Sequence, residues 1–164
     1  MTPGVTGTAQ LSPCGAYRYL LTRQWGTGPV MCWIMLNPST ATADADDPTV
    51  TRCWRFARRG GCGGLVIVNL FGLRSPSPRV LLYHPEPRGP GNDKMVFAQA
   101  SQANIVVAAW GAAGSWPRLA SRRSAVLEVL SGIPLWCLGV TQAGQPRHPL
   151  MVRAATPLIP WEAR

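Results

Sequence analysis

The chain has 164 residues and a formal net charge of +9, because 16 Lys and Arg residues stand against 7 Asp and Glu residues. That length suits a single domain with a core large enough to need no disulfide or metal. Lys94 is the only lysine, so nearly all of the positive charge is guanidinium, which binds phosphate and stacks on bases. A high-GC genome also raises the arginine content, but the charge favours nucleic acid as a partner.

The sequence indicates neither a membrane protein nor a metalloprotein. No uncharged apolar stretch approaches the roughly 18 residues of a membrane span, and the N-terminus lacks the pattern of a leader peptide. The 5 cysteines form no Cys-x-x-Cys pair, so we expect free thiols, no metal and no cofactor. We therefore expect a cytoplasmic monomer with no membrane partner.

The first part of the chain predicts a hairpin. Residues 1–15 are rich in Gly, Thr and Pro and are expected to form a flexible lead-in. Strand-forming residues fill Tyr17–Trp25, a turn follows at Gly26–Pro29, and the apolar run Val30–Leu36 returns. We expect the first strand to lie at the sheet edge and the second at its centre.

An acidic cluster and a helix follow. Asp47 before Pro48 is a helix-start signal, and apolar residues recur from Val50 at helical spacing until Gly60. Asp44 and Asp46 lie just before this start. For each of these carboxylates, helix capping and solvation are the alternative to a catalytic role.

Strands and helices then alternate to the end of the chain. We expect strands at Leu65–Val68, Asn104–Ala109 and Leu135–Leu138. A long proline-rich loop is expected over Leu70–Asp93, followed by a short helix capped by Asn92 or Asp93. A further helix is expected over Leu119–Leu130, with Arg118 and Arg122 facing solvent. The alternation predicts an α/β fold, with residues 16–164 as one three-layer α/β/α domain. Its central sheet would be mainly parallel, with four core strands and an N-terminal antiparallel edge strand.

Polar side chains follow each of the four core strands. Asn37 and Asn69 end the first two, Trp110-Gly111 ends the third, and the segment after the fourth contains His148. Because the carboxyl ends of parallel strands meet at one sheet edge, these residues predict a site. An asparagine amide can read a base edge or hold a water, and a histidine can donate to a developing anion. The asparagines could instead close turns, and the histidine could lie in a rigid, solvated loop.

Several motifs resemble a known family. The segments LNPSTA, DDPT, GGLVIVNLF, GPGND, AAWG and GVTQAGQPRHPL, spread over Tyr17 to Trp161, are similar to a bacterial domain-of-unknown-function family, number 1643. The family name supplies no activity.

The order of the motifs also resembles, more distantly, the uracil-DNA glycosylase superfamily. The resemblance implies that fold, with Asn37 before Pro38 positioning the hydrolytic water and Asn69 gripping the base edge. His148 before Pro149 would stabilise the departing base, and the loop after it would enter the duplex. The sequence departs from the superfamily where Leu150 replaces the usual serine, and the four cysteines that bind an iron–sulfur cluster in some branches are missing.

The expected site therefore has three groups of residues. The expected catalytic residues are Asn37, His148 and Asp47, and Asp47 could be the base if its loop folds back. The expected substrate-binding residues are Asn69, Pro38, Ser39, Phe71, Trp110 and Gly111. The expected nucleic-acid-binding residues are Arg74, Arg147, Pro149 and Leu150. Phe71, Trp110 and Trp54 are candidates to stack on the base, although such aromatics are more often in the core.

Three functions remain open at this point. The first is a DNA glycosylase that excises a modified or damaged base. The second is a hydrolase or transferase acting on free nucleosides or nucleotides, and the third is a non-catalytic nucleic-acid-binding module. A glycosylase needs its site in a positively charged groove, whereas an enzyme of free nucleosides needs a closed pocket.

Overall fold

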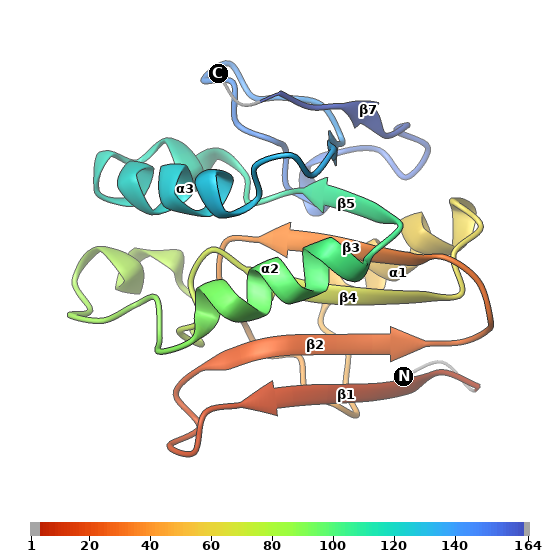
Figure 1. Ribbon diagram of the computed structural model, residues 1–164, viewed down its shortest axis with the longest axis horizontal. Coiled ribbons are helices and arrows are strands. Elements are labelled where there is room, and N and C mark those ends of the chain that lie inside the picture. Colours follow the sequence, from red (N-terminus) through yellow and green to blue (C-terminus); the bar gives the residue numbers. More distant parts are fainter. Residues whose placement is uncertain (1–3, 163–164) are drawn as a thin grey trace.

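The computed structural model describes residues 4–162, which form an α/β domain with one mixed seven-stranded sheet (Figure 1). The strands are β1 (Thr6–Leu11), β2 (Arg18–Gln24), β3 (Val30–Met35), β4 (Gly64–Asn69), β5 (Ile105–Ala108), β6 (Leu135–Cys137) and β7 (Ile159–Pro160), in the spatial order β1-β2-β4-β3-β5-β6-β7. The helices are α1 (Pro48–Arg59), α2 (Asn92–Gln102) and α3 (Pro117–Val129), with short 3-10 helices η1 (Pro78–Leu82), η2 (Ala112–Ser115) and η3 (Pro149–Met151).

The parallel core of the sheet confirms the expected topology. β4, β3, β5 and β6 are neighbours and run parallel, so their carboxyl ends share one edge. These strands end at Met35, Asn69, Ala108 and Cys137, each within one residue of the expected end. The side chains of β3, β4 and β5 are almost all buried because the sheet is covered on both faces.

The expected hairpin is wrong. β2 pairs antiparallel with β4, and β4 lies between β2 and β3. β2 is also not an edge strand, because β1 pairs with its other side. The apolar β4 is buried on both faces, and this arrangement gives it a hydrogen-bonded neighbour along each side.

The expectation of a flexible lead-in is wrong for Thr6–Leu11, which forms β1. Threonine hydroxyls link β1 to β2, and those of Thr8 and Thr22 lie 2.8 Å apart. Residues 1–3 of the expected lead-in and residues 163–164 of the expected domain lie outside the described part of the chain.

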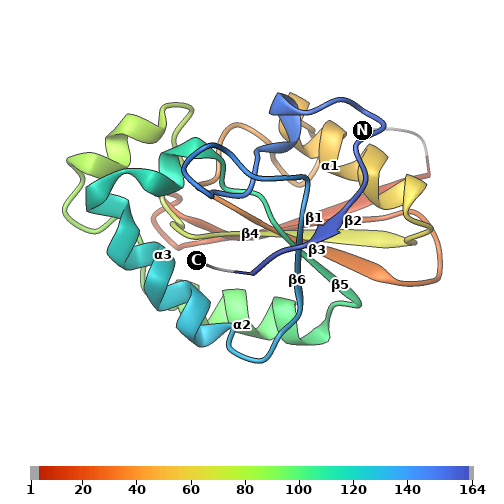
Figure 2. The same ribbon diagram turned by 90° about the horizontal axis from the view of Figure 1, so that it is seen from above.

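Helices cover both faces of the sheet, as Figure 2 shows. α1 packs on one face, where Val50, Cys53 and Phe56 join a core cluster with β3 and β4. α2 and α3 pack on the other face, where Val96 and Val126 belong to a second cluster. No helix within residues 4–162 is long and apolar enough to span a membrane.

The helix starts differ in how well they were predicted. Asp47 caps α1 as expected, because its side chain accepts from the Val50 amide. The N-cap of α2 is Gly91, so neither Asn92 nor Asp93 caps that helix.

Arg122 of α3 was expected to face solvent, but it is buried and its Nη1 lies 2.5 Å from Oδ1 of Asp93. An aspartate on α2 offers this arginine a partner that the sequence pattern of α3 cannot reveal.

Candidate functional site

A pocket of about 580 Å³ lies at the carboxyl edge of the parallel strands. Seven of the expected site residues line it, namely Asn37, Ser39, Asp47, Asn69, Trp110, Gly111 and His148. They come from the segments that follow β3 and β5, the end of β4, the start of α1 and the loop before η3. The sheet topology therefore brings together residues that are up to 111 positions apart, as Asn37 and His148 are.

The pocket is largely apolar. Met35 and Ile67 contribute side chains from β3 and β4, Val50 contributes from α1, and Pro76 and Pro78 contribute from the proline-rich loop. Apolar walls with a few polar groups are typical of small-molecule and base-binding sites. They also strengthen the hydrogen bonds that the polar groups make to a ligand, because water is excluded.

Two backbone carbonyls fix the side chain of Asn37. Its Nδ2 donates to the oxygen of Pro38 at 3.0 Å and to that of Ser75 at 2.9 Å. Pro38 therefore supports the site from outside the pocket lining and is itself buried. Because both donor positions of the amide are used, the Oδ1 atom is the group that remains to accept from a bound molecule.

Asn69 has a buried donor with no partner. The residue is 1% exposed, and its Nδ2 has no hydrogen bond within the described residues. Its backbone is held from the opposite face, where Nδ2 of Asn92 donates to the carbonyls of Asn69 and Leu70 at 2.9 and 3.1 Å. An unmet buried donor costs about 1–3 kcal/mol, which an acceptor on a ligand would recover.

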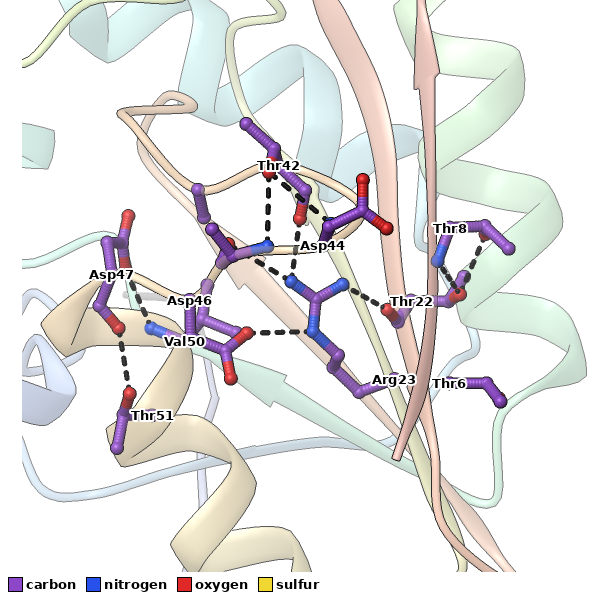
Figure 3. Close-up of polar contacts among 12 residues, drawn as sticks. Thr6, Thr8, Thr22, Arg23, Thr42, Asp44, Asp46, Asp47, Val50 and Thr51 are labelled. Carbon is purple, nitrogen blue, oxygen red and sulfur yellow. Dashed lines mark hydrogen bonds and ion pairs between the residues drawn. The ribbon is translucent and has the colours of Figure 1, made fainter. Parts of the chain in front are cut away.

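The loop before α1 is held against the sheet by Arg23, as Figure 3 shows. The Nε of Arg23 pairs with Oδ1 of Asp46 at 2.7 Å, and its Nη2 donates to the Thr42 carbonyl at 2.7 Å. Asp46 is therefore structural. The loop does fold back, and Asp47 lines the pocket while its Oδ1 accepts from the Val50 amide at 2.8 Å. Asp47 thus caps the helix and keeps its second carboxylate oxygen for another partner.

His148 presents a donor to the pocket. Its Nδ1 accepts from the Leu150 amide at 3.3 Å, which assigns the proton of the neutral ring to Nε2. Burial lowers the pKa of His148, and the charge of Asp47 opposes this shift. The lowered pKa favours the neutral ring, with its proton on Nε2.

The segment that contains His148 is tied to the end of β5. The indole Nε1 of Trp110 donates to Oε1 of Gln145 at 3.0 Å, and the amide of Gly111 donates to the Pro146 carbonyl at 2.9 Å. Trp110 is 1% exposed and packs edge-on against Trp161, with the two ring centroids 5.2 Å apart. It lines the pocket as a fixed wall.

Five other expected site residues do not line this pocket. Phe71 belongs to the core cluster on the face of α2 and α3, so the structure places it in the core and not in the pocket lining. Arg74 is half-buried and donates to the Gly15 carbonyl at 3.3 Å. Arg147 and Leu150 line two smaller depressions that each include a residue of η3, and Pro149 is buried in η3. Trp54, a stacking candidate, packs against Trp25 beside the core cluster of α1 and does not line the pocket.

Sequence reasoning missed Arg18. This residue is 3% exposed, lines the pocket, and donates from Nη1 to the Ala41 carbonyl at 2.6 Å. Burial lowers its pKa to about 10, although the charge of Asp47 acts in the opposite direction. No signal in the strand sequence distinguishes Arg18 from Arg23, which lies outside the pocket lining.

The pocket thus combines donors and acceptors that suit a polar, planar ligand. Asn69, His148 and Arg18 donate, whereas Asn37 and Asp47 accept. Within residues 4–162, no group of three His, Cys, Asp or Glu side chains is placed to hold a metal ion.

Comparison with known proteins identifies a family but no characterised relative. No curated protein and no solved structure matches the chain. The resemblance to uracil-DNA glycosylases therefore rests on the order of the motifs alone. One family model matches residues 18–150, which include β2 through Leu150 of η3 and all of the polar pocket residues described above. The chain belongs to the family described as "Protein of unknown function (DUF1643)".

Proposed function

We propose that this protein is a DNA glycosylase that hydrolyses the N-glycosidic bond of a flipped, modified or damaged base, on a fold of the uracil-DNA glycosylase type. The observation that carries the proposal is the convergence of Asn37, Asn69 and His148 on one pocket. Each of these residues lies at or after the end of a different strand, in the chain order of the superfamily's motifs. Glycosylases extrude the target nucleotide into such a pocket, at a cost of a few kcal/mol.

Asn69 would read the base. Its unpartnered Nδ2 offers a hydrogen bond to an acceptor on the base edge. The backbone bonds from Asn92 hold Asn69 in place before the base arrives, which reduces the ordering cost of binding. The apolar walls would pack on the faces of the flipped ring.

Asn37 and Asp47 would handle the water. The Oδ1 of Asn37 can accept from a water and orient it toward the sugar, but an amide cannot take its proton. Asp47 lines the same pocket and has a carboxylate oxygen that the helix cap does not use. It is therefore the candidate to receive the proton as the water adds to the oxocarbenium-like sugar.

His148 would stabilise the departing base. As the glycosidic bond breaks, its electron pair moves onto the base, which leaves as an anion. The Nε2–H of the neutral imidazole can donate to that charge, and the bond from Leu150 to Nδ1 keeps the ring oriented. The ring carries no charge that would have to be neutralised in the empty pocket.

DNA would approach over η3 and the depression next to it. Leu150 and Met151 are 44% and 73% exposed, and Met151 lines both the pocket and the depression that contains Arg147 and Arg153. An exposed apolar pair beside the pocket suits insertion between base steps, and nearby guanidinium groups suit the phosphates.

The test is incubation of the protein with DNA duplexes that carry a panel of modified bases, followed by mass analysis of the released bases. On a substrate that the intact protein cleaves, His148→Ala should lower turnover by about a hundredfold to a thousandfold while DNA affinity stays within a few fold. The matched control is His84→Ala, because Nδ1 of His84 also accepts from a backbone amide two residues later. This control should keep full activity.

The other two functions predict different results. Release of a base from free nucleosides but not from DNA would identify an enzyme of free nucleosides and contradict the proposal. DNA binding without release of any base in the panel would identify a binding module. Equal activity of His148→Ala and the intact protein would show that the reaction takes place elsewhere.

A further inference from the structure

We propose that Arg18 reads the target base, and that its free guanidinium edge and Asn69 select a 6-oxopurine through the neighbouring acceptors O6 and N7. This inference rests on the proposed function, because it assigns the base that the pocket takes. Both residues are buried and both line the pocket.

The guanidinium of Arg18 has one edge with no protein partner. Its Nη1 donates to the Ala41 carbonyl, whereas its Nε is buried without a hydrogen bond. Within residues 4–162 no carboxylate forms an ion pair with Arg18. The Nε and Nη2 atoms together form a planar fork with two parallel donors, which fits two adjacent acceptor atoms.

Arg23 shows what a structural arginine looks like in the same strand. It is equally buried, but its Nε pairs with Asp46 and its two terminal nitrogens donate to backbone carbonyls. All sides of that guanidinium are used. Arg18 is buried to a similar extent but has a single partner, which points to a ligand as the missing partner.

A β-bulge places Arg18 in the pocket. Leu20 pairs with Gln10, but the next pair along β1 joins Leu11 to Arg18, so Tyr19 is an extra residue in β2. Without the bulge, Arg18 and Arg23 would face opposite sides of the sheet, since they are five positions apart. With it, both reach the loop of Ala41 and Thr42. Bulges of this kind often re-aim a side chain beside an active site.

The surroundings of Arg18 favour a base over a phosphate as the ligand. Asp47 lies close enough for its charge to act on Arg18, so an added anion would meet a carboxylate. Met35, Ile67 and Trp110 supply apolar and aromatic surface, which suits a planar ring.

Among the bases, a 6-oxopurine matches the fork. Arginine binds guanine most often through O6 and N7, and hypoxanthine and xanthine carry the same pair. Adenine has a donor at position 6, and uracil has no two adjacent acceptors. Cytosine does carry two, N3 and O2, so its affinity is the comparison that separates it from a 6-oxopurine. Asn69 supplies a further donor for the ring that the fork holds.

The experiment measures calorimetric binding of free bases and of inorganic phosphate to the full chain. The affinity for hypoxanthine should be at least about tenfold higher than that for 7-deazahypoxanthine, which lacks only the N7 acceptor. It should also be higher than the affinities for adenine, cytosine and phosphate. Arg18→Lys keeps the charge but loses the fork, so it should weaken hypoxanthine binding about tenfold and remove the preference for N7. Arg118→Lys, at an exposed position on α3, should change neither.

Several results would overturn the inference. They are equal affinity for hypoxanthine and 7-deazahypoxanthine, tighter binding of cytosine, or phosphate binding that depends on Arg18. The comparison of the two purines uses the intact protein, so it decides the matter even if Arg18→Lys fails to fold. Because no turnover is needed, binding of 6-oxopurines without excision would contradict only the glycosylase proposal. Excision of a pyrimidine from DNA would contradict only this inference.

Discussion

Gly111 and His148 lie so close together that a Cβ atom placed on Gly111 would be 3.2 Å from the Cβ of His148. Gly111 has a φ of +77°, a conformation that residues with a side chain rarely adopt. Its amide also holds the Pro146 carbonyl, two residues before His148. The end of β5 therefore sets the position of the histidine.

Replacing Gly111 with alanine should disturb the site as well as the fold. The positive φ should cost about 1–3 kcal/mol of unfolding free energy, and the added methyl group should displace His148. The matched control is Gly132→Ala, because Gly132 has a φ of +83° and no atom within 4 Å of its Cβ position. Both variants should lose stability in chemical denaturation, but only Gly111→Ala should shift the imidazole NMR signals of His148. Identical His148 signals in the two variants would contradict this relationship.

The pKa of His148 predicts how stability depends on pH. Burial lowers this pKa below its ordinary value, so between pH 7.5 and 5.5 the unfolded chain gains a proton at this residue more readily than the folded protein does. The intact protein should therefore lose unfolding free energy on acidification through about pH 6.5. His148→Gln lacks this contribution. In urea denaturation, the unfolding free energy of the variant relative to that of the intact protein should therefore be higher at pH 5.5 than at pH 7.5. Parallel pH profiles would show that His148 is more solvated than the structure indicates.

The sequence predicted the parts of the site that follow from strand topology. Asn37, Asn69 and His148 each follow an apolar run, and parallel strands bring such positions to one edge whatever the details of packing. The cap of α1 by Asp47 was also predictable, because Asp before Pro is a local signal.

The parts that sequence reasoning missed depend on contacts between distant segments. The bulge at Tyr19 reverses the face of Arg18, and nothing in the strand-forming sequence marks it. β2 pairs with β4 and not with β3, although only a short turn joins β2 to β3, so this pairing involves segments that are distant in the chain. The burial of Arg122 depends on Asp93 of α2.

Arg147 gives a test of the path that DNA takes. Its Nε donates to the Val140 carbonyl at 2.9 Å, and it shares a depression with Arg153 beside the pocket. If Arg147 contacts a phosphate, Arg147→Ala should weaken DNA binding and reduce the slope of log K against log salt by about one. Fluorescence anisotropy at several salt concentrations measures this slope, with Arg118→Ala on α3 as the control. An unchanged slope would place the phosphates away from this depression.

Asn92 should prove to be a positioning residue for Asn69. It is 1% exposed and supplies two hydrogen bonds to the backbone at the end of β4, so Asn92→Ala should lower the unfolding free energy by about 1–3 kcal/mol. The matched control is Asn104→Ala, because the exposed Asn104 accepts a single bond from the Val30 amide at 2.9 Å, and its loss should cost less. Urea denaturation compares the two variants. Because Asn92 holds the residue that reads the base, Asn92→Ala should also reduce discrimination between bases in the calorimetric assay, whereas Asn104→Ala should not. A destabilised Asn92→Ala protein that keeps full discrimination would show that Asn69 holds its position without this support.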